Sequence, residues 1–172
     1  MMKGEEVQVR NEPVDMVAVL RRHFDPALQM LAQIIESCPE SLWAAQADGG
    51  PLWQHVMHAL IGVQFWFREA SERFAPPDFG SGPVPDLGAA PSFDVEKGLA
   101  TTYLQHIRSR AEAFFGSLDD ARLRSGSSIY EKCTYADLIL GQTRHIQHHV
   151  GYCNRILRDG GSLAAKWLGY GE

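Results

Sequence analysis

The chain has 172 residues, of which 45% are hydrophobic and 22% charged, and its net charge is −5 at pH 7. This length and composition predict one soluble, globular domain over residues 1–172 with a substantial core. The acidic balance, without a basic run interleaved with aromatic residues, argues against nucleic acid or an anionic membrane as a partner.

No targeting or membrane segment is expected. The first twenty residues carry acidic side chains and a proline where a secretory signal needs an apolar stretch. The most apolar stretch, residues 59–67, is far shorter than the roughly 20 apolar residues that cross a bilayer. The three cysteines form no Cys-x-x-Cys motif, which favours reduced thiols over a disulfide framework. We therefore expect a cytoplasmic protein.

The first predicted helix runs from Pro13 to about Ser37, where apolar residues recur at helical spacing. Within it, Asp25 followed by Pro26 is typical of a helix start, since Asp caps helices and Pro fits the first helical position. We therefore predict a helix in two pieces, with a kink or a restart at that point. Pro39 marks its end.

A linker over residues 40–50 and a second helix over residues 51–74 are predicted next. The linker offers Leu42 and Trp43 to the core. The second helix is apolar nearly all round in its first part, which indicates a position inside a bundle. Its polar residues include His55 and His58, and a buried imidazole without partners costs free energy.

Residues 75–92 form a long connection rich in Pro and Gly. Eighteen residues can extend about 60 Å, whereas a helix of 20 residues is only about 30 Å long. The connection can therefore cross back along the bundle. We predict that the second and third helices run parallel, joined by this crossover, in preference to a simple up-down-up-down order.

The third helix is predicted from a cap at Asp94 to about Leu118, and residues 119–132 are expected to be a loop. The fourth helix begins at or just before Tyr135 and ends at the glycines of residues 160–161. A tail over residues 163–170 is expected to pack through Trp167. Inward positions on the third helix are Leu99, Tyr103, Ile107, Ala111 and Phe114 or Phe115. No strand pattern or repeat is visible, so the sequence predicts an all-α four-helix bundle.

Two histidines of the fourth helix form the most informative motif. His145 and His149 stand four residues apart, and helical phase places both on the buried side of the helix. His148 falls at the solvated margin. Neutral imidazole is a common metal ligand, and this spacing directs two of them to one point. The alternative is a pair of histidines hydrogen-bonded in a core or lining a solvated helix edge.

A third ligand is available on the second helix. If the second and fourth helices are antiparallel, His58 lies about 12 Å from the start of its helix and the histidine pair about 14–20 Å from the end of theirs. His55 lies about one turn nearer the mouth and ranks second, as an outer-shell group or an exposed residue. Three histidines without a fourth protein ligand are typical of catalytic zinc sites. Nickel, iron or cobalt also accept imidazole.

Other chemistries lack their motifs. A di-iron carboxylate bundle needs Glu-x-x-His twice and a zinc protease needs His-Glu-x-x-His, and neither occurs in this chain. Cys153, one turn after His149, is interpreted as a buried core thiol.

These residues together resemble the DinB/YfiT-like superfamily of metalloenzymes. The resemblance rests on His58-Ala59-Leu60 followed by Phe65-Trp66-Phe67, on the long crossover, and on the last-helix segment from His145 through His148-His149 to Gly151. It implies up-down-down-up order, a divalent metal ion on His58, His145 and His149, and frequently a homodimer. Characterised relatives include transferases and isomerases that use bacillithiol, mycothiol or glutathione.

The chain departs from the family after the second ligand of the fourth helix. The family often has Arg-Gly-Gln there, whereas this chain has Val150-Gly151-Tyr152. The substrate contacts are therefore not carried over, and no catalytic residue is assigned.

Two functions follow as hypotheses. The first is a metal-dependent enzyme, with zinc or nickel as the ion, that transfers a low-molecular-weight thiol to a small electrophile. The second is a non-catalytic, metal-binding or stress-related dimeric bundle whose histidines have a structural role. Metal content and a thiol-consumption assay separate them.

Overall fold

The computed structural model describes residues 14–47 and 49–169. Its helices are α1 (Met16–Ser37), α2 (Glu40–Trp43), α3 (Leu52–Trp66), α4 (Lys97–Gly116), α5 (Asp120–Arg124) and α6 (Tyr135–Asp159). The described residues form two isolated β-bridges but no strand. The all-α prediction is therefore confirmed.

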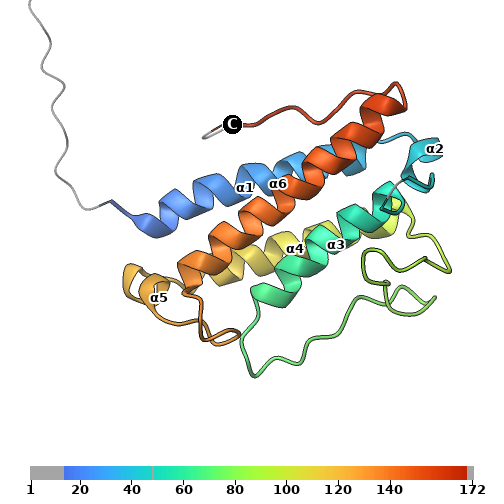
Figure 1. Cartoon of the computed structure of the whole chain (residues 1–172). Helices are drawn as coiled ribbons and strands as arrows, with labels where there is room; N and C mark the ends of the chain where they lie inside the picture. The colour runs from blue at the N-terminus through green and yellow to red at the C-terminus, as the bar shows by residue number, and fades with distance from the viewer. Residues whose placement is uncertain (1–13, 48, 170–172) are drawn as a thin grey trace, which may run out of the picture.

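The four long helices α1, α3, α4 and α6 pack as a bundle (Figure 1). Helix α6 contacts α1 and α3, and α4 contacts the same two helices. Along the chain, α1 and α6 run in one direction and α3 and α4 in the other. This is the up-down-down-up order, and the predicted parallel pair joined by a crossover is confirmed. It leaves α3 and α6 antiparallel and in contact.

The core draws apolar side chains from all four long helices, so packing between helices, more than helix propensity, stabilises each of them. An aromatic cluster fills one part of it, with the rings of Phe67 and Phe114 stacked at 4.1 Å and Phe24 at 5.2 Å from Phe67. The largest fully buried side chains are Trp53, Phe24, Leu31, Ile34, Leu52, Met57, Leu60, Ile107, Ile139, Ile146 and Leu157.

The first helix is one continuous element, so the predicted restart at Pro26, which would divide it into two pieces, is wrong. Pro26 lies inside α1, although it lacks the N–H of a helical hydrogen bond. Buried side chains stand on both sides of it, including Phe24 and Leu28. Asp25 does not start a new helix, and its carboxylate accepts a hydrogen bond from Nε of Arg21 at 3.1 Å. The free energy gained by burying the apolar face of one continuous helix is larger than the local preference of Asp25-Pro26 to start a new one.

The boundaries around α3 also differ from the prediction. Part of the expected linker is the short helix α2, in which Trp43 is buried and donates its indole N–H to the backbone oxygen of Val95 at 2.6 Å. Helix α3 ends at Trp66 rather than at residue 74. Ion pairs of Glu69 with Arg122 and of Glu72 with Arg110 hold the chain beyond it.

Three further expectations are corrected. Asp94 does not cap α4, because its carboxylate accepts the indole N–H of Trp53 at 3.0 Å and Glu96 takes the cap position. Leu99 is at the surface rather than inward, and a short helix, α5, lies in the expected loop. Trp167 of the tail is 72% exposed, so it does not pack as predicted. The expected end of that tail, at residue 170, lies outside the described residues.

The crossover between α3 and α4 is anchored beside the start of α3. The buried amide of Gln54 donates to the backbone oxygens of Asp86 at 2.8 Å and of Ala89 at 3.0 Å. This contact holds one part of an otherwise irregular segment over the bundle.

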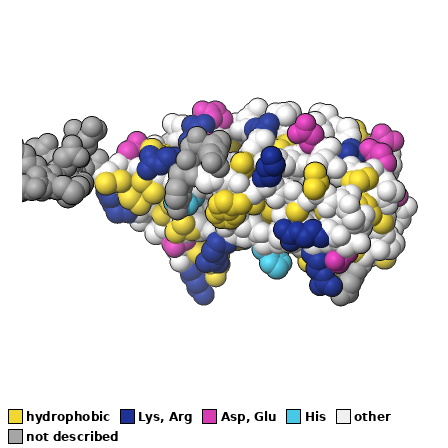
Figure 2. All heavy atoms as spheres, turned by 90° about the horizontal axis from the view of Figure 1, so that it is seen from above, with side chains coloured by type: hydrophobic (Ala, Val, Ile, Leu, Met, Phe, Trp, Pro, Cys, Tyr) yellow, Lys and Arg dark blue, Asp and Glu magenta, His cyan; other side chains and the backbone are white. Residues whose placement is uncertain are grey.

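The molecular surface carries charges of both signs. Figure 2 shows Lys and Arg side chains and Asp and Glu side chains interspersed with hydrophobic ones over the face seen from above. Within residues 14–47 and 49–169, no helix combines the length and the apolar character needed to cross a membrane.

Candidate metal site

Helix α6 sets the position of two histidines through its start and its amphipathic pattern. Thr134 and Asp137 form a capping box at its N-terminus. From there the helical phase buries Gln142 and His149 and leaves His148 exposed. The predicted distribution of polar residues around this helix is confirmed.

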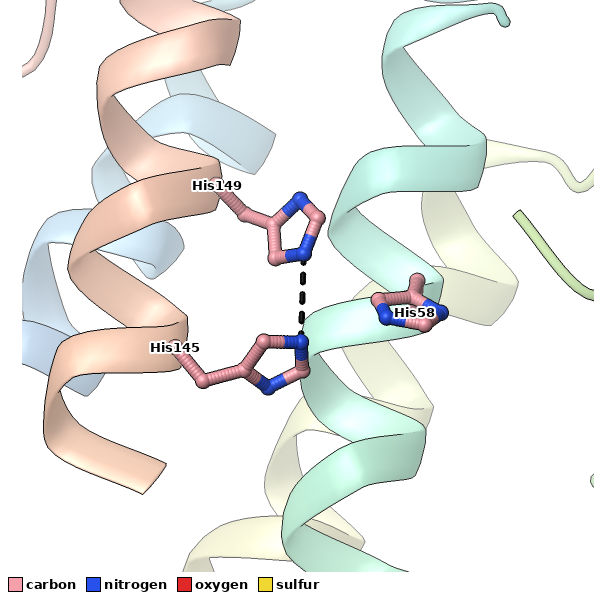
Figure 3. A group of neighbouring side chains, drawn as sticks. All are labelled: His58, His145 and His149. Carbon is pink, nitrogen blue, oxygen red and sulfur yellow. Dashed lines mark hydrogen bonds between the residues drawn. The ribbon is translucent and has the colours of Figure 1, made fainter. Parts of the chain in front are cut away.

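Three histidines converge between α3 and α6. Nitrogen atoms of His58, His145 and His149, one from each ring, all lie within 4.8 Å of one another. The ring centroids are separated by 5.0, 4.9 and 4.8 Å. Figure 3 shows His145 and His149 one above the other on α6, extending toward α3, from which His58 projects. The tertiary structure thus brings together the three residues that the sequence suggested.

The spacing and chemistry of these nitrogens fit a divalent ion. The Nε2 atoms of His145 and His149 are 3.2 Å apart. Two nitrogens about 2.0–2.1 Å from a tetrahedral zinc ion lie roughly 3.3 Å apart. No acidic side chain belongs to the group of ligand atoms. The cluster could therefore hold one metal ion through three neutral ligands and leave a coordination position open.

Burial keeps the histidines in the form that binds metals. Removal from water lowers the pKa of His145 to about 4 and that of His149 to about 3, and repulsion by neighbouring histidines adds to both shifts. Burial also lowers the pKa of His58, although the carboxylate of Asp86 opposes this change. At neutral pH the three rings are uncharged, and protons do not compete for their lone pairs.

These lowered pKa values predict how pH affects the metal-free protein. Free histidine has a pKa of about 6.5. Between that pH and the lower pKa values of the folded state, the unfolded chain therefore binds more protons than the folded protein does. The free energy of unfolding is therefore expected to fall as the pH drops below 6.5. Urea denaturation of chelator-treated protein at pH 7.5, 6.5, 5.5 and 5 measures it. Replacing both His145 and His149 by Gln should flatten the profile, and an equal slope in that variant would contradict the assignment.

His55 orients the most buried of the three histidines. Its Nδ1 lies 3.3 Å from Nδ1 of His149, so a ring that offers Nε2 to an ion has a partner for its other nitrogen. The His55 ring also stacks on Tyr152 at 4.0 Å. Gly49, with φ of +86°, allows this packing, because a Cβ there would lie 2.8 Å from the Tyr152 hydroxyl oxygen. The expectation that His55 could be an exposed residue is wrong, since it is 3% exposed.

Gln142 and Gly62 lie beside His145. Nδ1 of His145 and Oε1 of Gln142 are both buried without a hydrogen-bond partner. Both border the space above Gly62, where a Cβ would lie 2.9 Å from that nitrogen and 3.1 Å from that oxygen. Sequence reasoning missed these residues, although a glycine four positions after His58 in an apolar helix is a signal for close approach.

A cavity of about 920 Å³ opens beside the cluster. His58 and His145 lie in its wall, whereas His149 is on the side away from it. Asp86 of the crossover also lines the cavity, close enough to His58 to affect its pKa. The other candidates are not part of this group of nitrogens: His148 is exposed, although its ring meets that of His149 edge to face at 5.1 Å, and Cys153 is buried as predicted. Burial raises the pKa of the Cys153 thiol to about 12.

The comparisons with known proteins complete this description. A family model described as the DinB superfamily matches residues 23–153, which include all three converging histidines and the crossover. Neither a curated protein nor a solved structure matches the chain.

Proposed function

Because the chain belongs to the DinB superfamily, we propose that it is a divalent-metal-dependent enzyme that joins a low-molecular-weight thiol to a small electrophile. The observation that carries the proposal is the convergence of three neutral imidazoles beside a large cavity. His58, His145 and His149 would hold the ion, with zinc or nickel preferred for a set of nitrogen ligands. Bound there, the ion would supply positive charge that lowers the pKa of a thiol or a water molecule.

The protein's own groups would orient the reactants. His55 keeps the ring of His149 in one orientation through the 3.3 Å contact between their Nδ1 atoms. The cavity beside His58 and His145 would receive the electrophile and exclude part of the water around it. In the transfer, a bond forms between sulfur and an electrophilic carbon. The bond from that carbon to the leaving group breaks, the leaving group keeps the electron pair, and the thiol proton goes to solvent.

A non-catalytic role is the alternative proposal, and one observation favours it. The four buried or half-buried histidines form a continuous polar cluster that links α3 to α6. An ion in this cluster would strengthen the contact between the two helices without any reaction. With either role, we propose a homodimer, which the exposed side chains of Leu163 and Trp167 would help to form.

Metal content and thiol consumption test the enzyme proposal. Purified protein is dialysed, analysed for metals, loaded with zinc or nickel, and mixed with glutathione, mycothiol, bacillithiol or cysteine and 1-chloro-2,4-dinitrobenzene. We expect metal-dependent loss of free thiol that His58→Ala reduces to background. His148→Ala, which changes an exposed histidine of the same helix, should keep the activity.

Two results would contradict the proposals in different ways. If the loaded protein is inert with all four thiols and this electrophile while His58→Ala only lowers the melting temperature, the structural role holds and the enzyme proposal fails. If the protein neither carries nor takes up metal, both roles fail.

A further inference from the structure

The cavity beside the histidines is long as well as large. Its lining follows α3 from His58 to Trp66 and α6 from His145 back to Asp137. Eight residues of a helix span about 12 Å. The three histidines therefore lie at one end, and at the other end the ring of Trp66 meets that of Tyr130 at 6.5 Å. A volume of about 920 Å³ matches the sites of small organic ligands, which occupy about 300–1,000 Å³.

Most of this lining is apolar and aromatic. Phe65 contacts both Trp66 and Phe74 with its ring at 5.0 Å from each, and the Arg68 guanidinium covers the Phe65 ring at 4.0 Å. On the opposite wall, Leu140 of α6 is 47% exposed. Exposed apolar surface of this kind marks sites where a ligand or a partner binds. The body of a ligand that lies along this wall must therefore be apolar.

The lining carries two cationic side chains that are available to an anionic ligand. Arg144 and Lys132 both line the cavity, and neither forms an ion pair or a side-chain hydrogen bond within the described parts of the chain. Of the two acids in the lining, Asp137 is engaged by Thr134 at the start of α6. Asp137 keeps its charge, and Asp86 lies at the histidine end, but neither carboxylate forms an ion pair with Arg144 or Lys132 within the described residues.

A buried acceptor in the same wall also lacks a partner. Oε1 of Gln142 has no hydrogen-bond partner, and the residue is only 6% exposed. A buried amide oxygen without a partner costs about 1–3 kcal/mol, which is a reason to expect a donor from a neighbouring side chain or a ligand. Gln142 lies at the histidine end of the cavity, close to Gly62.

We propose that this cavity binds an aromatic or alkyl organic anion, with its apolar body between Phe65 and Leu140 and its negative group held by Arg144 near the histidine end, while Lys132 near the other end adds to the attraction. The proposal rests on the function proposed above, since it identifies the chemical class of the electrophile that would meet the thiol. Arginine suits this task because its planar guanidinium binds carboxylate or sulfonate oxygens in pairs. Binding itself requires no metal ion at the histidines.

A pair of probes with one ring system tests the inference. The probes are 8-anilinonaphthalene-1-sulfonate, which carries an anionic group, and N-phenyl-1-naphthylamine, which lacks it. Fluorescence titration of the full-length protein, as purified and after chelation, gives the affinity for each. We expect saturable binding of one sulfonate per chain. The Arg144→Gln/Lys132→Gln variant should weaken sulfonate binding about tenfold or more, as charge-assisted bonds are lost, and leave the neutral amine unaffected.

Two further variants keep the test decisive. Leu140→Asp adds a negative charge to the same wall and should weaken binding of the sulfonate more than that of the amine. Because Leu140 is 47% exposed, the fold should tolerate the change. Arg22→Gln/Arg108→Gln removes two arginines from a second cavity next to α1 and α4 and should change neither affinity.

The outcomes separate this inference from the proposed function. If the Arg144 and Lys132 changes leave sulfonate binding intact, or the Arg22 and Arg108 changes abolish it, the inference is wrong even when metal uptake and thiol transfer are found. If binding follows the expected pattern in a protein that takes up no metal, the cavity assignment stands and the enzyme proposal fails.

Discussion

His149→Ala is expected to weaken metal binding more than about a hundredfold, because loss of an outer-shell partner alone costs about 10- to 100-fold and this change removes a ligand. His149 is the most buried of the three histidines and contacts both His145 and His55. Competition with a chromogenic chelator for zinc and for nickel measures the loss. The metal-free variant should stay folded, since one neutral ring is replaced by a smaller apolar side chain.

The matched control is the neighbouring position. His148→Ala removes an exposed imidazole from the same helix and should keep the affinity within about twofold. His55→Phe provides a graded case, because it keeps the ring that stacks on Tyr152 and removes the Nδ1 contact to His149. It should cost about 10- to 100-fold, as is typical for partners of metal-bound histidine. Equal affinities in His149→Ala and the unmodified protein would exclude this site.

Gly62→Ala is expected to weaken metal binding about tenfold or more, although it changes no ligand. The added Cβ would lie 2.8 Å from Cε1 and 2.9 Å from Nδ1 of His145, so the ring must move away from α3. Catalytic and binding groups tolerate displacements of only about 0.5 Å. Alanine also favours helix over glycine by about 1 kcal/mol, so the metal-free variant should lose little stability. Metal affinity and urea denaturation together separate the two effects.

Gly151→Ala is the control for this second prediction. Gly151 lies on α6 two residues beyond His149, and a Cβ there would meet no atom within 4 Å. This variant should gain up to about 1 kcal/mol of stability from helix propensity with unchanged metal affinity. A parallel loss of affinity in both glycine variants would show that helix rigidity, rather than the position of His145, controls the site.

The two sides of the histidine cluster differ in a way that bears on its chemistry. His149 faces the protein interior, where His55 and Tyr152 pack around it. His58 and His145 face the cavity. A reactant could therefore reach an ion in the cluster through this cavity, between α3 and the first half of α6. This asymmetry supports a site that binds substrate rather than one closed on all sides by protein ligands.

Helix ends that depend on local chemistry were predictable. The last helix ends at residue 159, where glycines follow, and the first ends at Ser37, before Pro39. Expectations failed where distant residues decide the outcome. Pro26 stays inside α1 because side chains on both sides of it are buried by other helices. Asp94 does not cap α4 because its carboxylate accepts a hydrogen bond from the indole of Trp53, a residue remote in sequence.

The sequence by itself determined the helical class, the phase of α6 and the pairing of His145 with His149, because these depend on spacings within one segment. The parallel arrangement of α3 and α4 also followed from the length of one connection. Only the tertiary structure decided that His58 completes the cluster and that His55 contacts His149 on the side away from the cavity. It also placed Gly62 against His145 and formed the cavity. Those features depend on the register of α3 against α6, which is set by the packing of side chains on both helices.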